Sequence, residues 1–440
     1  MNKKPNVIWI LGDQHRGQAL SCRGDANVST PNIDNLSVYG VNFTGAVSGY
    51  PLCCPFRGSM LTGKYPHKCV PGHEFRLDSD QKTIADVFKE NGYHTSYVGK
   101  WHLDGFKESE GRAALHVVPP NRRGGFDYWM GYENNNSQWD CYVHGNADGE
   151  IAPYKLEGYE TDTLTDLFID SISKKHDKPF FAVLSVQPPH NPYSAPEEFM
   201  KQHNPAEIKF RPNVPDVGYV KEKAGRELAG MYAMIENLDY NIGRVRNALK
   251  EFGIDGNTHI IYFSDHGDMH GSHGQFLKTS PYEEAIRVPF VIGGEKLCYN
   301  GRKVGRHNVL INHVDIAPTT LGLCGIDKPD FMQGTDYSGY RLAGRVLENL
   351  PDSAFIQSVI ATKHPHSVDR EWRGVVTNDG YKYVCFENMD WLLFDLNNDP
   401  YEQVNLAHNS VYKNLRSRLR SRLKKWIDDT DDKFTVPMND

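Results

Sequence analysis

Short apolar runs that end at a polar or glycine residue recur along this chain, and they restrict its fold more than any other feature. They are residues 7–11, 94–98, 180–186, 259–264 and 288–292, of which residues 94–98 (HTSYV) are apolar only in part and are predicted as a strand. Such runs, bounded by turn residues, are typical of strands that are buried on both faces of a sheet. The first run leads into Asp13 and the fourth into Asp265.

Segments with helical signals lie between these runs. Residues 30–36 begin with a capping threonine and a proline at the first helical position. Helices are also predicted for residues 83–91, 221–252 and 315–323. Strands alternating with helices predict an α/β fold, a mainly parallel sheet covered by helices on both faces. Open sheets of this kind bind ligands at the carboxyl ends of their strands.

The pattern changes near residue 350. Short β-type segments follow, bounded by turn residues, and the chain then forms a charged helix over residues 411–428. The β-type segments are residues 355–362, 371–376, 381–387 and 391–396. We therefore predict two domains, a catalytic α/β domain over residues 1–350 and a small α+β domain over residues 351–440. Residues 105–159 and 191–219 lack clear periodicity and are expected to be loops that shape a substrate site.

Composition excludes several classes of protein. With 440 residues, 39% of them hydrophobic and 24% charged, the chain is an ordinary globular one. A net charge of −7 without a basic run argues against nucleic acid, and no apolar stretch approaches membrane-spanning length. Residues 7–11 are too short for a signal peptide, so we expect a cytoplasmic protein, or a periplasmic or secreted one if a leader has been removed.

Eight cysteines are spread along the chain, at positions 22, 53, 54, 69, 141, 298, 324 and 385. Without a secretory signal, free thiols are expected rather than disulfides. A pairing of Cys22 with Cys69 is left open by the sequence.

Residues 53–64 (CCPFRGSMLTGK) are the most informative stretch for function. Cys53 follows a turn and opens a predicted helix, where backbone N–H groups favour an anionic or polar oxygen species. Arg57 lies one helical turn later and can direct its guanidinium to the same place. Alone, such a cysteine is also compatible with a buried structural thiol.

The spacing Cys53-x-Pro55-x-Arg57-x-x-x-Leu61-Thr62-Gly63 resembles the signature of type I sulfatases, of the alkaline phosphatase-like superfamily. The resemblance implies that a formylglycine-generating enzyme oxidises Cys53 to formylglycine (3-oxoalanine). One hydroxyl of its hydrate attacks sulfur, and deprotonation of the other later expels sulfate, a form of covalent catalysis. Residues 393–406 also resemble the family, whose fold joins a large sheet to a smaller C-terminal one.

Asp13-Gln14 and Asp265-His266 each follow an apolar run, so the predicted sheet can bring them together. Their oxygens and imidazole suit a hard or borderline divalent cation. The resemblance implies one metal held by these residues and residue 53, with Ca²⁺ favoured by the family. Gln14 and His266 replace commoner family residues, which raises Mn²⁺, Mg²⁺ or Zn²⁺ as candidates. Each aspartate is also compatible with a turn-forming role.

The resemblance also assigns catalytic roles to cationic and imidazole side chains. Arg57 braces the nucleophile, Lys100 contacts the nucleophile or sulfate, and His102 orients the diol or takes its proton. His190 binds sulfate, and Lys278 bridges sulfate and the leaving oxygen. Further residues in segments that could line the pocket, with solvated loops as the alternative, are His73, Glu74, Trp139, Asp140, His273, His364 and Arg370.

These residues together predict a sulfuric ester hydrolase for a small organic sulfate ester, either a sulfated sugar or an aryl sulfate. The alternative is a formylglycine-dependent phosphonate monoester or phosphodiester hydrolase, which the Gln14 and His266 variant favours. A non-catalytic protein that binds sulfated glycans is a third possibility, and it predicts an incomplete set of cations. The sequence assigns no oligomeric state.

Overall fold

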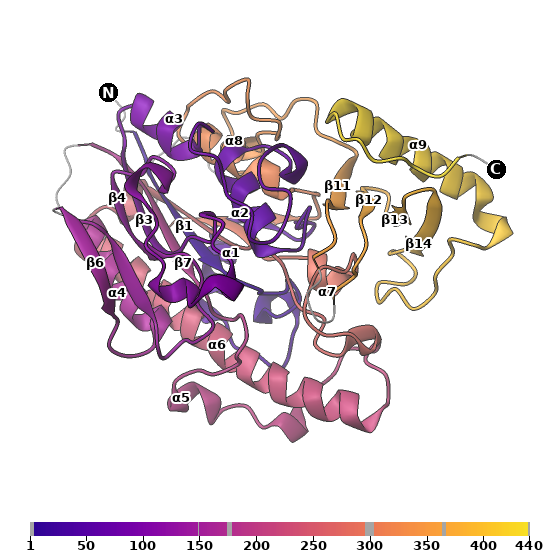
Figure 1. Ribbon diagram of the computed structural model, residues 1–440, viewed down its shortest axis with the longest axis horizontal. Coiled ribbons are helices and arrows are strands. Elements are labelled where there is room, and N and C mark those ends of the chain that lie inside the picture. The colour runs from indigo at the N-terminus through magenta and orange to yellow at the C-terminus, as the bar shows by residue number, and fades with distance from the viewer. Residues whose placement is uncertain (1–3, 148, 174–177, 295–302, 363–366, 439–440) are drawn as a thin grey trace.

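A ten-stranded mixed sheet runs through the larger part of the molecule (Figure 1). The computed structural model describes residues 4–147, 149–173, 178–294, 303–362 and 367–438. The strand order in the sheet is β10-β2-β9-β8-β1-β7-β3-β4-β5-β6. The strands are β1 (Asn6–Gly12), β2 (Val41–Phe43), β3 (His94–Lys100), β4 (Tyr128–Tyr132), β5 (Tyr142–Asn146), β6 (Glu150–Lys155), β7 (Phe180–Val186), β8 (Thr258–Ser264), β9 (Phe290–Gly293) and β10 (Gly305–His307).

The centre of this sheet is parallel, as the sequence predicts. Strand β1 pairs in parallel with β7 and β8, and β3 pairs in parallel with β7 and β4. Antiparallel pairing occurs where β9 joins β8 and β2, and where β5 joins β4 and β6. All seven residues of β1 are buried, which explains its uninterrupted apolar run.

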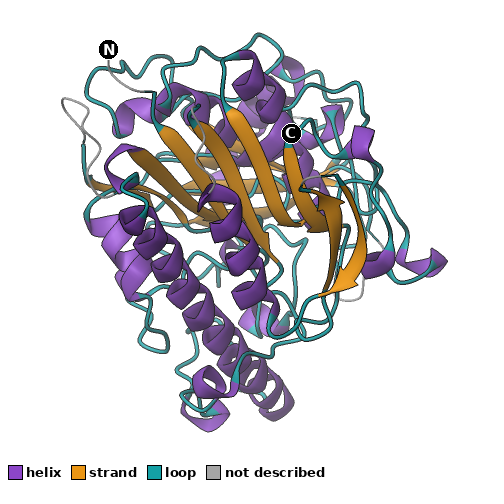
Figure 2. Ribbon diagram, turned by 90° about the vertical axis from the view of Figure 1, so that its left-hand side faces the viewer, coloured by secondary structure: helices purple, strands orange, loops and turns teal. Residues whose placement is uncertain are grey.

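Helices cover both faces of the sheet, and Figure 2 shows the strands between them. They are α1 (Pro31–Val38), α2 (Cys53–Thr62), α3 (Ile84–Glu90), α4 (Glu160–Ser173), α5 (Glu197–Met200), α6 (Gly218–Glu251), α7 (Glu283–Ile286), α8 (Ile316–Leu323) and α9 (Lys413–Asp429). Helices α2, α3 and α8 share one core cluster with Trp9 of β1. Helices α1, α4 and α6 share the opposite cluster with Ile10. The alternation of side chains along β1 therefore serves two cores.

The prediction that residues 105–159 form loops over the site is wrong in part. Strands β4, β5 and β6 lie there and extend the sheet at one edge. Their pattern is hard to recognise because glycines interrupt it. At Gly145, φ is 156° and a Cβ would lie 1.8 Å from the carbonyl oxygen of Trp129, so only glycine allows the strands to approach. Strand β6 is largely exposed and so carries no apolar signal.

The C-terminal part forms a second sheet of four antiparallel strands, in the order β11-β12-β13-β14. They are β11 (Ser353–Ser358), β12 (Trp372–Thr377), β13 (Tyr381–Phe386) and β14 (Met389–Asp395). One face packs on α9 through Leu419 and Leu423. The other face packs on Val47 and Ile286 of the larger part. Figure 1 shows α9 on the outer side of this sheet.

A buried lysine joins the second sheet to the larger part. The Nζ atom of Lys382, on β13, lies 2.6 Å from a carboxylate oxygen of Glu402 and 2.8 Å from one of Glu283 on α7. It also donates to the carbonyl oxygen of Pro281 at 2.8 Å. The Lys382 side chain has no solvent exposure, so its charge is balanced by these oxygens instead of water.

We expect Lys382→Met to lower the free energy of unfolding by about 3–5 kcal/mol, because it leaves buried carboxylates without their cation. Urea denaturation followed by fluorescence measures this change. Lys201→Met is the control, because Lys201 pairs with Glu197 at the surface and its side chain is 70% exposed. Equal denaturation midpoints for the two variants would contradict the assigned role of Lys382.

The seven cysteines among the described residues are free, as predicted, and Cys22 and Cys69 are not paired. Cys298 lies outside the described residues. Within the described residues, no helix combines the length and apolar character needed to cross a membrane.

Candidate functional site

The carboxyl ends of four neighbouring strands deliver polar side chains to one edge of the large sheet. Asp13 follows β1, Lys100 ends β3, His190 follows β7 and Asp265 follows β8. These strands are adjacent in the order β8-β1-β7-β3, so residues far apart in the sequence meet at this edge.

Cys53 lies at the start of α2 and faces this cluster. Its Sγ atom is 3.1 Å from Nε2 of His266, 3.4 Å from Nζ of Lys278 and 3.5 Å from Oδ1 of Asp13. Burial and Asp13 raise the pKa of the Cys53 thiol, but Lys278, Lys100 and His266 outweigh them and lower it. The thiol therefore lies where an anion is stabilised.

Asp13 is the charge centre of the cluster. Its Oδ2 accepts hydrogen bonds from Nζ of Lys100 at 2.7 Å and from Nη2 of Arg57 at 3.2 Å. Burial would raise the pKa of Asp13, but the cations of Lys100, Lys278 and Arg57 hold it well below its usual range. Asp13 is therefore an anion although its side chain is fully buried.

Arg57 is fixed in place on more than one side. Its Nη1 donates to the carbonyl oxygen of Lys100 at 2.9 Å and to Oγ of Ser185 at 2.8 Å, while Nη2 donates to Asp13. All of α2 is buried, so Arg57 cannot swing out to solvent. The guanidinium thus supports the floor of the site, as the sequence predicts for a bracing residue.

Four residues offer ligand atoms to one point. Donor atoms of Asp13, Cys53, Asp265 and His266 all lie within 4.8 Å of one another, and all four residues are buried. The Nδ1 atom of His266 lies 3.0 Å from the carbonyl oxygen of Gly267, which leaves Nε2 directed at Cys53. Oδ2 of Asp265 is buried without a hydrogen-bond partner. A divalent cation fits this donor set, since it would satisfy that oxygen.

Gln14 lies beside this group, with its side-chain amide already engaged. Its Oε1 accepts from Nζ of Lys278 at 3.0 Å, and its Nε2 donates to Asp268 at 2.5 Å and to Tyr193 at 3.2 Å. Its backbone N–H donates to Oδ1 of Asp265 at 2.9 Å. Gln14 therefore holds Lys278 and Asp265 in position, and its role as a metal ligand stays a prediction.

Lys278 and His190 form a pair beside Cys53. Nζ of Lys278 donates to Nε2 of His190 at 2.8 Å, and Nδ1 of His190 lies 2.7 Å from the carbonyl oxygen of Asn191. Burial and Lys278 hold the pKa of His190 well below its usual range. Because Nε2 of the neutral His190 accepts from Lys278 and Nδ1 donates to Asn191, the ammonium group of Lys278 is the donor that this pair offers to an anionic oxygen.

His102 is buried and its backbone is left-handed, with φ of 56°. Burial and the Lys100 cation hold the pKa of His102 well below its usual range, so the ring is neutral. Its Nδ1 atom is buried without a hydrogen-bond partner. A neutral imidazole that lines the same cavity as Cys53 can accept a proton.

A cavity of about 190 Å³ opens above Cys53. It is lined by Leu52, Cys53, His73, Lys100, His102, Glu108, Asn134, Asn136, His190, Asn191, Leu277 and Lys278. Larger cavities of about 310 and 450 Å³ lie elsewhere and contain none of the predicted site residues. We place the candidate site in the smaller cavity because the converging charges are there.

The further pocket residues named from the sequence are dispersed. His73 lines the cavity, whereas His273 stacks on Tyr282 and Arg370 lies over Phe386. Oε1 of Glu74 is 3.7 Å from Nε2 of His73. Asp140 pairs with Arg112 and Lys155, and the ring N–H of Trp139 donates to Oγ of Ser194. His364 lies outside the described residues.

Several residues of the site were not found from the sequence. Ser185 lies inside a strand, and Tyr193 and Asp268 lie behind Gln14. Asn134 and Asn136 reach the cavity from the loop between β4 and β5. Asp268 lies only three residues after Asp265, but nothing in its spacing distinguishes it from a turn residue.

Comparison with known proteins places this site in a family. The model of the family described as Sulfatase matches residues 5–326, and the model described as "N-sulphoglucosamine sulphohydrolase, C-terminal" matches residues 271–429. An ulvan-active sulfatase of Formosa agariphila is 33% identical over 98% of this chain and 82% of its own. An N-acetylglucosamine-6-O-sulfatase of Bacteroides thetaiotaomicron is 27% identical over 99% and 89%.

Solved structures share the fold. The yidJ protein of Bacteroides fragilis superposes with a TM-score of 0.87 at 29% identity, over 98% of this chain and 97% of that one. A phosphonate monoester hydrolase of Agrobacterium radiobacter superposes with a TM-score of 0.79 at 23% identity, over 97% and 96%. The second likeness concerns the fold alone, so the fold does not separate sulfate from phosphonate chemistry.

Proposed function

The chain belongs to the sulfatase family and is a sulfuric ester hydrolase, and from this premise we propose that it cleaves the sulfate ester of a sulfated sugar through a formylglycine formed from Cys53. An aryl sulfate is the nearest other substrate. The observation that carries the proposal is the position of Sγ of Cys53, within 3.5 Å of Asp13, His266 and Lys278. That sulfur marks where a hydroxyl of the hydrate would stand.

Two groups complete the chemistry. A formylglycine hydrate supplies one hydroxyl that attacks sulfur and a second whose deprotonation later releases sulfate. A divalent metal, Ca²⁺ by family and Mn²⁺, Mg²⁺ or Zn²⁺ by donor set, would supply a positive charge that polarises the sulfate group. Asp13, Asp265, His266 and residue 53 would hold it, and Gln14 is a further proposed ligand.

The chain's own residues act on both ends of the scissile bond. Lys278, held by Nε2 of His190 at 2.8 Å and lying 3.4 Å from Sγ of Cys53, can bind sulfate and donate to the departing oxygen, while His190 positions it. Lys100 neutralises Asp13 behind the nucleophile. His102, neutral and lining the same cavity, is placed to remove a proton from residue 53.

The walls of the cavity favour a hydroxylated substrate. Asn134, Asn136 and Asn191 line it and present amide donors and acceptors, which suit sugar hydroxyls. The names of the Formosa and Bacteroides relatives refer to ulvan and to a 6-O-sulfated amino sugar. These observations support a sulfated sugar over a simple aryl ester.

Mass spectrometry of the tryptic peptide covering residues 24–57 tests the nucleophile. This peptide contains Cys53 and Cys54 and no internal lysine or arginine. For protein from the native host, we expect a loss of about 18 Da and alkylation of one thiol only, since an aldehyde no longer reacts as a cysteine. An unmodified peptide with two alkylated thiols would contradict the proposal.

A panel of matched esters tests the substrate class. We expect kcat/KM to be highest for sulfated sugars, lower for aryl sulfates and lowest for phosphonate monoesters and phosphodiesters. A preference for phosphonate esters would favour the alternative hydrolase, which the Gln14 and His266 pair keeps open.

We expect Lys278→Met to lower kcat on a sugar sulfate by about 10²–10³-fold, because one donor to the developing oxyanion is lost. The loss should be smaller for 4-nitrophenyl sulfate, whose leaving group needs little stabilisation. Steady-state kinetics on both substrates provide the comparison. Equal losses on the two esters would instead place Lys278 in sulfate binding alone.

A further inference from the structure

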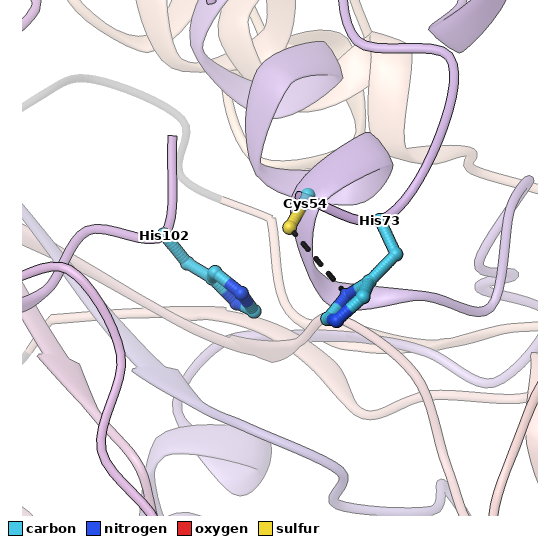
Figure 3. A group of neighbouring side chains, drawn as sticks. All are labelled: Cys54, His73 and His102. Carbon is cyan, nitrogen blue, oxygen red and sulfur yellow. Dashed lines mark hydrogen bonds between the residues drawn. The ribbon is translucent and has the colours of Figure 1, made fainter. Parts of the chain in front are cut away.

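A second group of potential metal ligands includes Cys54, the neighbour of Cys53 at the start of α2. It consists of Cys54, His73 and His102, whose ligand atoms all lie within 4.8 Å of one another. Figure 3 shows the two imidazole rings turned toward each other below Cys54. The three residues come from the first turn of α2 and from two separate loops, so the fold brings them together.

We propose that Cys54, His73 and His102 form a binding site for a soft or borderline divalent ion, with Zn²⁺ as its representative. This site shares no residue with the group at Asp13, and its donors are one sulfur and two nitrogens. Thiolate and imidazole select zinc-like ions, whereas the two carboxylates at the other site suit harder ions.

The spacing of the ligand atoms is close to that of an occupied site. Sγ of Cys54 lies 4.0 Å from Nδ1 of His73, and the rings of His73 and His102 are 5.5 Å apart between centroids and nearly perpendicular. Tetrahedral zinc bonds of about 2.3 Å to sulfur and 2.0 Å to nitrogen place ligand atoms about 3.5 Å apart. The Cys54–His73 pair would therefore contract by roughly half an ångström around an ion, and the pairs with His102, which lie within 4.8 Å, by no more than about 1.3 Å.

An unsatisfied ring atom gives independent support. Nδ1 of His102 is buried without a hydrogen-bond partner, in a side chain that is only 3% exposed. Buried polar atoms of this kind are rare in folded proteins and call for a partner. The ring of His102 points toward His73 and Cys54, so an ion bound between them would supply that partner (Figure 3).

A carboxylate stands behind one of the ligands. Oε1 of Glu74 lies 3.7 Å from Nε2 of His73, and the same oxygen accepts the backbone N–H of Glu108 at 2.8 Å. A carboxylate behind a ligating histidine is the usual arrangement at zinc sites, since it orients the ring and raises its basicity. The cavity lined by His73 and His102 leaves room for a fourth, exchangeable ligand.

Occupation of this site would interfere with turnover, a consequence that depends on the proposed function. A neutral imidazole has one basic lone pair, and a metal-bound His102 has none left to accept a proton. Zinc bound here would therefore inhibit the hydrolase without displacing the metal at Asp13. Binding itself does not depend on the hydrolase activity.

Metal binding is tested in a Cys53→Ala background, which removes the thiol of the other site. After dialysis against Zn²⁺ in the presence of excess Ca²⁺, we expect about one more zinc per chain than in the same protein with Cys54→Ser, since the serine hydroxyl is a poor ligand for zinc. Co²⁺ as the probe should give a thiolate charge-transfer absorption band that Cys54→Ser abolishes. His73→Gln provides a second variant at a half-buried position, and Cys324→Ser, a buried thiol outside the cavity, is the matched control.

Equal zinc content in all these proteins, with no difference in the cobalt spectrum, would overturn the site. In enzyme that carries the formylglycine, we expect Zn²⁺ to lower the rate at least about tenfold, because the loss of a general base typically has a larger effect than this. We expect the Cys54→Ser enzyme to resist this inhibition. Zinc that binds through Cys54 but leaves the rate unchanged would support the site and count against the role of His102.

Discussion

Replacement of Cys53 by alanine is expected to lower kcat/KM for sulfate esters by at least about 10⁴-fold, because it removes the thiol whose oxidation yields the proposed nucleophile. The cations around this position remain in Cys53→Ala, so substrate binding should survive. A KM or inhibition constant for inorganic sulfate close to that of the wild type would show this directly. Stopped assays on a sugar sulfate measure the loss of rate.

Cys324→Ala is the control for this experiment. Cys324 is buried like Cys53 but belongs to the core next to α8, so its loss affects packing and not the site. We expect its activity to stay near that of the wild type once both proteins are compared at equal folded concentration. Substantial activity in Cys53→Ala would rule out a nucleophile derived from Cys53.

Asp13→Asn is expected to affect stability as well as activity. The carboxylate of Asp13 accepts from both Lys100 and Arg57, and none of the three side chains is more than 1% exposed. An amide of the same shape leaves Lys100 buried without its carboxylate partner and Arg57 with only Asp265 at 3.8 Å, so the free energy of unfolding should fall by about 3–5 kcal/mol. Activity should fall at least about 10²-fold, since a proposed metal ligand is also lost.

Chemical denaturation measures the stability change, and Asp166→Asn provides the comparison. Asp166 pairs with Arg244 at the surface and its side chain is 63% exposed, so its substitution should leave the unfolding midpoint close to the wild type. A stable Asp13→Asn protein would show that Lys100 and Arg57 find other partners. Loss of the Asp13 carboxylate should also weaken metal binding, so we expect that added Ca²⁺ does not restore the stability of Asp13→Asn. Restoration by Ca²⁺ would contradict this account.

The fold and the centre of the site could be predicted because their signals are local in the sequence. A strand buried on both faces needs an uninterrupted apolar run, and the residue that follows it is delivered to the sheet edge. Asp13 and Asp265 were found in this way, and the structure places them on the same cluster. Cys53 and Arg57 were found through the resemblance of residues 53–63 to the family signature, and their spacing of four residues agrees with one turn of the helix α2 that contains them.

The remainder depends on contacts that the sequence does not encode locally. Strands β4 to β6 were predicted as loops because Gly131 and Gly145 interrupt their pattern, although those glycines allow the strands to approach. The amide of Gln14 was predicted to face a metal, and the structure shows it held by Lys278, Asp268 and Tyr193. Partners of this kind come from three separate segments, so only the fold reveals them.

The burial of α2 has a consequence for how an active molecule is made. Cys53 is 2% exposed, and every residue of the helix that it opens is buried. Another protein cannot reach that sulfur once α2 has packed against the sheet. The proposed conversion of Cys53 therefore has to take place on the nascent or unfolded chain, where residues 53–63 form a continuous accessible peptide. The yield of active protein would then be set by a competition between oxidation and folding, and molecules that fold first would remain permanently inactive although correctly folded.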